Sequence, residues 1–146
     1  MSNDLQRIKD EESKDFQLDY SDLDKIKLFN INIPYLHHKY LMKYREQQSV
    51  VTHLSERKHK YYHEARLYYL GKADPEIYKE KPLDNTILKS DVDTWVKADE
   101  RYSHVLQQLS SAESILDYYK RIVDSIPFYS NLVKNHLDIL KFENGI

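Results

Sequence analysis

Apolar and aromatic side chains recur at alternating spacings of three and four residues through the second half of the chain. Every position of this series is apolar or aromatic: Trp95, Ala98, Tyr102, Val105, Leu109, Ala112, Leu116, Tyr119, Val123 and Ile126. Because this spacing keeps side chains along one side of a helix, it is typical of a coiled-coil contact. We therefore expect a long helix over residues 91–126, and the series forms a seam that packs in the core or joins copies of the chain.

The first half of the chain predicts a second long helix, over residues 34–70. Pro34 suits the first turn of a helix, where its missing N–H has no partner to lose, and Gly71 suits the position just after a helix end. Half of the prolines lie in residues 71–89, which we expect to form the loop between the two long helices. The two helices should then form an antiparallel hairpin.

Both ends of the chain are expected to carry shorter elements. Ser125 and Pro127 should end the long helix and start a last one over residues 128–142. Residues 1–18 are rich in charge and poor in apolar groups, so we expect a flexible N-terminal extension. Residues 19–146 should form one helical domain that oligomerises and carries the binding function.

The composition limits the fold and the chemistry. Two glycines and four prolines cannot supply the turns of a sheet, and they cannot form a glycine-rich phosphate loop. The fold class expected is therefore all-α. A lone hairpin buries little apolar surface, which indicates a homo-oligomer. There is no cysteine, no secretory signal and no apolar run long enough for a membrane, so we expect a cytoplasmic protein with no membrane contact.

Charge is unevenly distributed along the chain. The net charge is −3 over residues 1–33, +5 over residues 34–72 and −4 over residues 73–146. A basic helix between acidic regions is typical of a polyanion-binding face. The stretch ERKHKYYHEARLYYLGK interleaves cations with tyrosines, and single-stranded nucleic acid binds through both, since cations contact phosphates and rings stack on bases. The candidate DNA-binding residues are Arg57, Lys58, Lys60, Tyr62, Arg66, Tyr69 and Lys72, with Tyr62 and Tyr69 expected to be exposed on one helix face.

Other interpretations remain open. Charged helix faces are often merely solvated, and tyrosines at this spacing often belong to a seam, so a structural coiled-coil or assembly protein without a DNA role is the main alternative. His59 and His63 stand four residues apart and would be the ligands of a metal-dependent enzyme, but the usual motif order is absent. Asp91, Asp93, Asp99 and Glu100 suit a helix start. We expect no enzyme activity, no metal and no cofactor.

The segment YHEARLYYLG resembles a motif of the UvsY family of T-even phage recombination mediators, which reads approximately LKARLDYYSG. The resemblance extends over about residues 30–146, through the long second helix to the tail HLDILKFENGI. The resemblance implies a phage-encoded mediator in the host cytoplasm that forms helical oligomers of about six to eight subunits. We expect this assembly to be ring-like. Such a protein would bind single-stranded DNA, weaken the hold of the phage single-strand-binding protein on it, and help a RecA-like (UvsX-type) recombinase nucleate its filament there.

Two positions of this motif bear on DNA contact. The family's motif Arg corresponds to Arg66 in this sequence, but the position of its motif Lys is occupied by Glu64. A contact that the resemblance implies is therefore lost or reversed in sign. Arg57, Lys58 and Lys60, one to two turns earlier, are expected to compensate.

Overall fold

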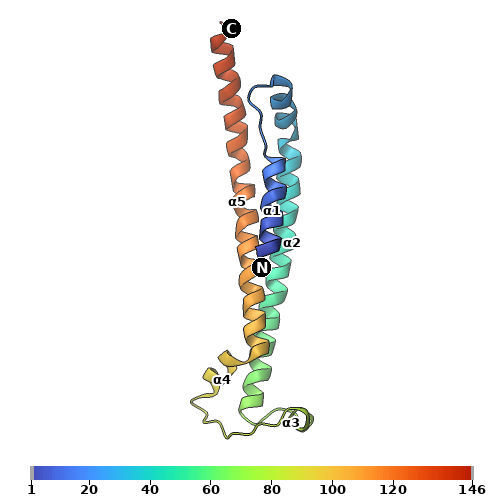
Figure 1. Ribbon diagram of the computed structural model, residues 1–146, viewed down its shortest axis with the longest axis vertical. Coiled ribbons are helices and arrows are strands. Elements are labelled where there is room, and N and C mark those ends of the chain that lie inside the picture. Colours follow the sequence, from blue (N-terminus) through green and yellow to red (C-terminus); the bar gives the residue numbers. More distant parts are fainter. Residues whose placement is uncertain (1, 146) are drawn as a thin grey trace. The chain divides into compact units, whose positions relative to one another are not determined.

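The computed structural model describes residues 2–145 (Figure 1). Over these residues it contains helices and no strands, which confirms the all-α prediction. The chain divides into two compact units: Met1–Gln48 with Ser114–Ile146, here unit 1, and Ser49–Glu113, here unit 2. In chain order the elements are α1 (Ser2–Asp15), α2 (Leu23–Tyr69), α3 (Pro75–Glu80), α4 (Val92–Ala98) and α5 (Glu100–Glu143).

Helix α2 begins earlier than predicted. The carboxylate of Asp22 accepts hydrogen bonds from the backbone N–H groups of Asp24 and Lys25, at 3.0 and 3.2 Å, and so caps the first turn. Pro34 lies inside the helix and not at its start. An interior proline costs about 3 kcal/mol. Burial of apolar side chains on both sides of it offsets that cost and carries the helix through.

Helix α5 also differs from the prediction, at both ends. The chain breaks at Asp99, whose carboxylate accepts from the N–H groups of Arg101 and Tyr102 at 3.0 and 3.3 Å and caps α5. At the other end α5 continues through Pro127. The hydroxyl of Ser125 donates to the carbonyl of Ile122 at 2.7 Å, within the helix, so it caps no new helix.

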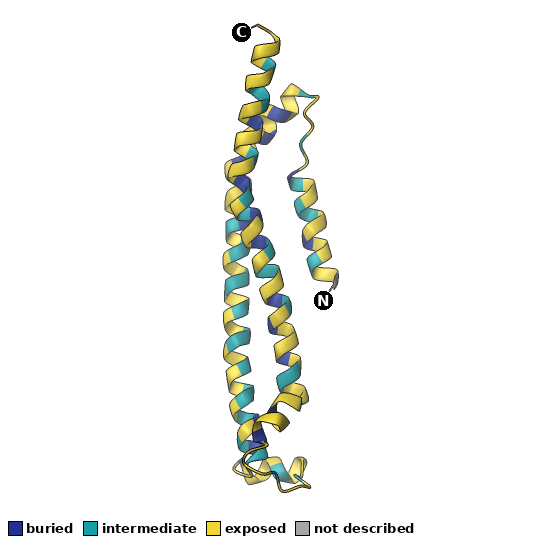
Figure 2. Ribbon diagram, turned by 90° about the vertical axis from the view of Figure 1, so that its left-hand side faces the viewer, coloured by how far each residue is buried: buried dark blue, intermediate teal, exposed yellow. Residues whose placement is uncertain are grey.

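The core of unit 1 lies between α1, the first part of α2 and the last part of α5. Aromatic contacts show that α2 and α5 are antiparallel here: Phe29 meets Tyr129, at 5.9 Å between ring centroids, and Tyr40 meets Tyr119 at 6.4 Å. Figure 2 shows the buried positions spaced along the helices as the helical repeat requires. The fully or nearly buried members are Ile8, Phe16, Ile26, Phe29, Ile33, Leu36, Tyr40, Tyr119, Ile122, Ile126 and Val133.

The expectation of a flexible stretch over residues 1–18 is wrong for most of that stretch. Helix α1 places Ile8 and Phe16 in the core of unit 1, and Phe16 stacks on Tyr129 at 4.8 Å. Ion pairs from α1 to Lys39 and Lys43 of α2 add to these apolar contacts. The charge-rich stretch over residues 1–18 therefore contains a helix that packs on the core, and its few apolar residues lie on one side of that helix.

Charged groups fix α1 to α2. The carboxylate of Asp15 accepts from the Lys39 ammonium at 2.6 Å and from the Tyr40 hydroxyl at 2.7 Å. Glu11 pairs with Lys43 at 3.1 Å. Hydrogen bonds from Lys43 and Lys39 lower the pKa of Glu11. Burial by itself raises the pKa of Asp15, but the hydrogen bonds from Lys39 and Tyr40 outweigh burial, so the pKa of Asp15 is lowered as well.

We expect acid to release α1. A carboxyl whose folded pKa is lowered stabilises the folded state above its unfolded pKa, and the contribution disappears as pH falls through the folded value. Exchange of the α1 amides should therefore accelerate relative to those of α2 between about pH 5 and pH 2. Hydrogen exchange followed by mass spectrometry measures this. The Asp15→Asn variant should show a weaker pH dependence of this relative rate. If the exchange of α1 relative to α2, corrected for intrinsic rates, did not change with pH in the unaltered protein, the contact would be refuted.

Unit 2 is built from the end of α2, the connecting segment and the start of α5. Its small core consists of Ala65, Val92 and Val96, with the rings of Tyr62, Tyr69 and Tyr102 packed against it. Gly71, at φ 75°, follows the end of α2 as predicted. The predicted loop 71–89 contains the short helix α3, which Asp74 caps through the N–H of Glu76 at 3.1 Å.

The seam is mostly buried within the single chain. Because the chain breaks at Asp99, the regular spacing is interrupted between Ala98 and Tyr102. Trp95 remains 42% exposed and meets only the edge of this core, 5.9 Å from the ring of Tyr69. Buried seam positions are Val105, Leu109, Ala112, Tyr119 and Ile126, while Tyr102, Leu116 and Val123 are partly buried and Ala98 is exposed. Within the described residues no helix is both long and apolar enough to cross a bilayer.

Candidate nucleic-acid interface

The predicted cations lie on the last turns of α2 and just beyond it. Arg57, Lys60, Arg66 and Lys72 are exposed, and Lys58 is partly buried. Successive residues of a helix are turned by about 100°, so the offset of nine positions from Arg57 to Arg66 places them on opposite edges of α2. The predicted set is therefore two groups and not one face.

Tyr62 and Tyr69 are not free for stacking on a base, which corrects the expectation that they are exposed. The hydroxyl of Tyr62 donates to Asp93 at 2.7 Å and that of Tyr69 donates to Asp99 at 3.0 Å. Both rings pack on the core of unit 2. Burial and the bond to Asp99 raise the pKa of Tyr69 to about 12, and the bond to Asp93 raises the pKa of Tyr62. These tyrosines join α2 to α4 and α5.

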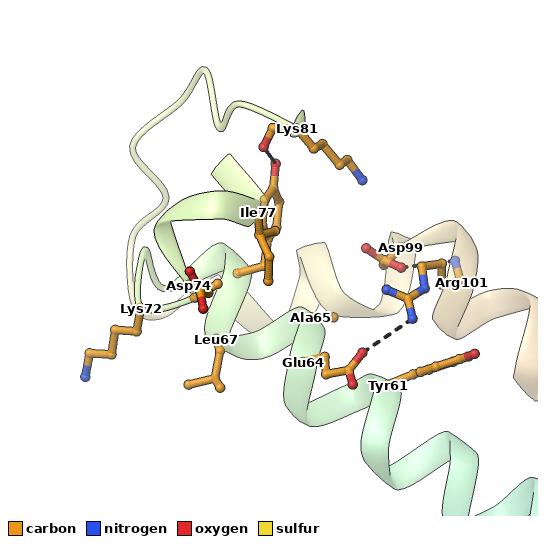
Figure 3. Close-up of a pocket in the computed structure, with 12 residues that line it drawn as sticks. Tyr61, Glu64, Ala65, Leu67, Lys72, Asp74, Ile77, Lys81, Asp99 and Arg101 are labelled. Carbon is orange, nitrogen blue, oxygen red and sulfur yellow. Dashed lines mark hydrogen bonds and ion pairs between the residues drawn. The ribbon is translucent and has the colours of Figure 1, made fainter. Parts of the chain in front are cut away.

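The edge of α2 that carries Arg57 also carries Tyr61 and Glu64. Here α5 contributes Arg101, whose guanidinium lies 4.5 Å from the centroid of the Tyr61 ring (Figure 3). A guanidinium nitrogen of Arg101 is 3.4 Å from the Glu64 carboxylate. Lys60 also pairs with Glu64, at 3.8 Å. Lys60 and Arg101 thus both lie beside the negative charge of Glu64, which stands at the position where the family motif has Lys.

Sequence patterns did not predict Arg101 as part of this site. It is 37 positions from Glu64 along the chain and lies in a different helix. No local spacing connects the two residues. Only the packing of α5 beside α2 within unit 2 brings Arg101 and Glu64 together. Predicting Arg101 as part of the site would have required the register of this helix pair.

A hollow of about 410 Å³ lies beside this edge, within unit 2. Figure 3 shows Tyr61, Glu64 and Arg101 together at one side and Ile77 of α3 at the other, with Lys72 pointing away. Its charged lining residues are balanced: Lys72, Lys81 and Arg101 against Glu64, Asp74 and Asp99. Apolar atoms come from Ala65, Leu67, Ala73 and Ile77.

The histidines and acids singled out by the sequence serve no joint site in the described part of the chain. His59 and His63 are exposed on α2. Among residues 2–145 there is no cluster of three or more His, Asp or Glu side chains that could hold a metal. Asp99 caps α5 and Asp93 binds the Tyr62 hydroxyl, so these carboxylates have structural partners.

Fold and site together define an all-helical protein that presents cations and one ring–guanidinium pair on a long helix. A family model described as "Recombination, repair and ssDNA binding protein UvsY" matches residues 11–146. The chain belongs to the UvsY family. The match begins within α1, earlier than the resemblance seen in the sequence.

Solved structures agree with this assignment at the level of the fold. The chain is similar to the bacteriophage T4 recombination mediator protein UvsY in lattice type II, with a TM-score of 0.81 and 22% identity, over 96% of this chain and 97% of that one. For lattice type I the TM-score is 0.80 at 22% identity, over 94% and 98% of the two chains. A comparison with curated proteins gives no match.

Proposed function

We propose that this chain is a recombination mediator that binds single-stranded DNA. It would help a RecA-like recombinase assemble on DNA coated by the phage single-strand-binding protein, in the cytoplasm of the infected host. The observation that carries the proposal is the family match over residues 11–146, together with exposed cations on the same helix as the family motif. The bacteriophage T4 structures are of a recombination mediator with the same fold.

The DNA contacts proposed are the exposed cations of α2 and its partner helix. Arg57 and Lys60 lie on the edge of α2 that Arg101 of α5 contacts. Their positive charges outweigh the negative charge of Glu64 on the same edge. Arg66 serves the opposite edge, and Lys58 and Lys72 extend the positive region. Because each chain offers few contacts, strong binding requires several copies acting on one strand.

Exposed apolar stripes in unit 1 support assembly. On α2, Leu28, Ile31, Tyr35 and Met42 are exposed at spacings that keep them on one side. On α5 the exposed set Phe128, Leu132, Ile139 and Phe142 follows the same rule. Apolar stripes of this length are uncommon on a monomer. We propose that they join copies of the chain into a ring-like homo-oligomer of about six to eight subunits.

A salt titration tests the DNA proposal. Binding through phosphate contacts releases counterions, so affinity for single-stranded DNA should fall by orders of magnitude between about 50 and 200 mM salt. Fluorescence anisotropy with a labelled oligonucleotide measures it. Lys60→Ala should weaken binding and flatten the salt slope, whereas Lys120→Ala, an exposed lysine of unit 1, should change neither.

Two results would contradict the proposal. Affinity that stays constant across this range of salt would exclude phosphate contacts as its source. Failure to be retained on single-stranded DNA even at low salt would favour the structural alternative, in which the helices serve assembly alone.

A further inference from the structure

We propose that the hollow beside Tyr61 and Arg101 takes up one unstacked base of the single strand. This inference rests on the proposed function and adds to it a defined subsite, a base pocket distinct from the phosphate contacts. It also assigns the aromatic role to Tyr61, because the structure gives Tyr62 and Tyr69 other partners.

The lining of the hollow suits a neutral, flat ligand. Three cationic and three anionic residues border it, and Lys72 points away from it (Figure 3), so it offers no net positive charge to a phosphate. Apolar atoms of Ala65, Leu67 and Ile77 supply surface for a ring. Its volume of about 410 Å³ accommodates a nucleobase.

Tyr61 and Arg101 form the stacking wall. The guanidinium of Arg101 lies over the Tyr61 ring at 4.5 Å, and the Arg101 side chain is still 66% exposed. The guanidinium therefore lies over the ring and remains accessible to solvent. A base placed against this pair from the solvent extends the contact, because guanidinium planes and bases pack face to face.

Glu64 acts here as a positioning residue. Its carboxylate holds the Arg101 guanidinium at 3.4 Å, from the turn of α2 that follows Tyr61. This ion pair restrains the Arg101 guanidinium over the Tyr61 ring, so that it does not move freely in solvent. The acid at the position where the family motif has Lys thus serves to orient a cation from α5, and its own charge is compensated.

The positions along α2 give the strand a continuous path. Arg57 lies one turn before Tyr61 on the same edge, about 6 Å along the helix axis. In the described part of the chain Arg57 makes no ion pair, and it is exposed. A phosphate bound at Arg57 would leave the adjoining base within reach of the hollow, which separates base contact from phosphate contact along one helix.

Paired oligonucleotides test this assignment. One strand carries bases and the other has the same phosphates with all bases replaced by abasic sites. Tyr61→Ala should bind the base-bearing strand about tenfold more weakly than the unaltered protein does and bind the abasic strand equally well. Tyr61→Phe, which keeps the ring, should match the unaltered protein on both strands. Arg101→Lys, which keeps the charge but loses the plane, should lose severalfold on the base-bearing strand and little on the abasic one.

Further outcomes separate this inference from the proposed function. Equal losses by Tyr61→Ala on both strands, or no loss on either, would overturn the base subsite while leaving DNA binding intact. Binding of neither strand by the unaltered protein at low salt would overturn the proposed function itself. If Tyr61→Ala fails to fold, Ile77→Trp fills the hollow from α3 and should show the same selective loss.

Discussion

Replacing Ile31 by glutamate is expected to reduce the assembly to single chains. Ile31 is 76% exposed on the apolar stripe of α2, so the substitution should disturb little packing inside the described chain. In an assembly, the same position would be covered by another copy. A buried, unpaired carboxylate there costs several kcal/mol at every repeated contact. Sedimentation velocity measures the change in mass.

The same variant should lose most of its affinity for single-stranded DNA. Every cation remains, but contacts that a strand makes with one chain no longer add to those made with its neighbours. Linked binding sites gain about 10² to 10⁴ over single ones, and we expect a loss of at least hundredfold in anisotropy titrations.

Asn30→Glu provides the matched control for Ile31→Glu. It adds the same charge one position earlier, on an exposed site that points away from the stripe. Assembly and DNA binding should be nearly unchanged in this control. An Ile31→Glu protein with the mass and affinity of the control would show that the α2 stripe joins no copies.

Tyr40→Ala is expected to cause the largest loss of stability. Its side chain is 1% exposed, lies 5.5 Å from the Phe16 ring between centroids and donates to Asp15 at 2.7 Å. Truncating a large buried ring costs about 3–5 kcal/mol, and the loss of the bond to the partly buried Asp15 carboxylate adds about 1–3 kcal/mol. Domains are stable by only about 5–15 kcal/mol. Denaturant unfolding measures the difference.

Tyr40→Phe separates the two contributions. It keeps the ring and removes only the hydroxyl, so it should cost about 1–3 kcal/mol. Both variants are best measured in the Ile31→Glu background, because assembly makes apparent stability depend on protein concentration. A Tyr40→Ala protein no less stable than Tyr40→Phe would contradict the packing of α1 and α5 around this ring.

The sequence indicated the fold class and the two long helices, but it misplaced their ends. Scarcity of glycine and regular apolar spacing correctly indicated helices, but the spacing did not reveal the break at Asp99 between α4 and α5. Pro34 and Pro127 suggested boundaries, yet both lie inside helices, because tertiary burial outweighs the local cost of a proline. Helix α1 was missed since its docking depends on Lys39 and Lys43, more than twenty positions away.

The candidate site was predictable only in its cations. Arg57, Lys60 and Arg66 are exposed, as charged side chains on a helix usually are. The role of the tyrosines depends on partners from other elements: Asp93 and Asp99 engage Tyr62 and Tyr69, while Arg101 covers Tyr61. Such partners are set by helix register, which a single sequence does not reveal.

Native mass spectrometry of the unaltered chain, alone and with a single-stranded oligonucleotide at low salt, tests the central proposal most directly. We expect a homo-oligomer whose mass is a multiple of 17.6 kDa. Addition of the strand should shift that oligomer by the mass of the oligonucleotide. A single chain of 17.6 kDa that leaves the strand unbound would contradict both the assembly and the DNA-binding role.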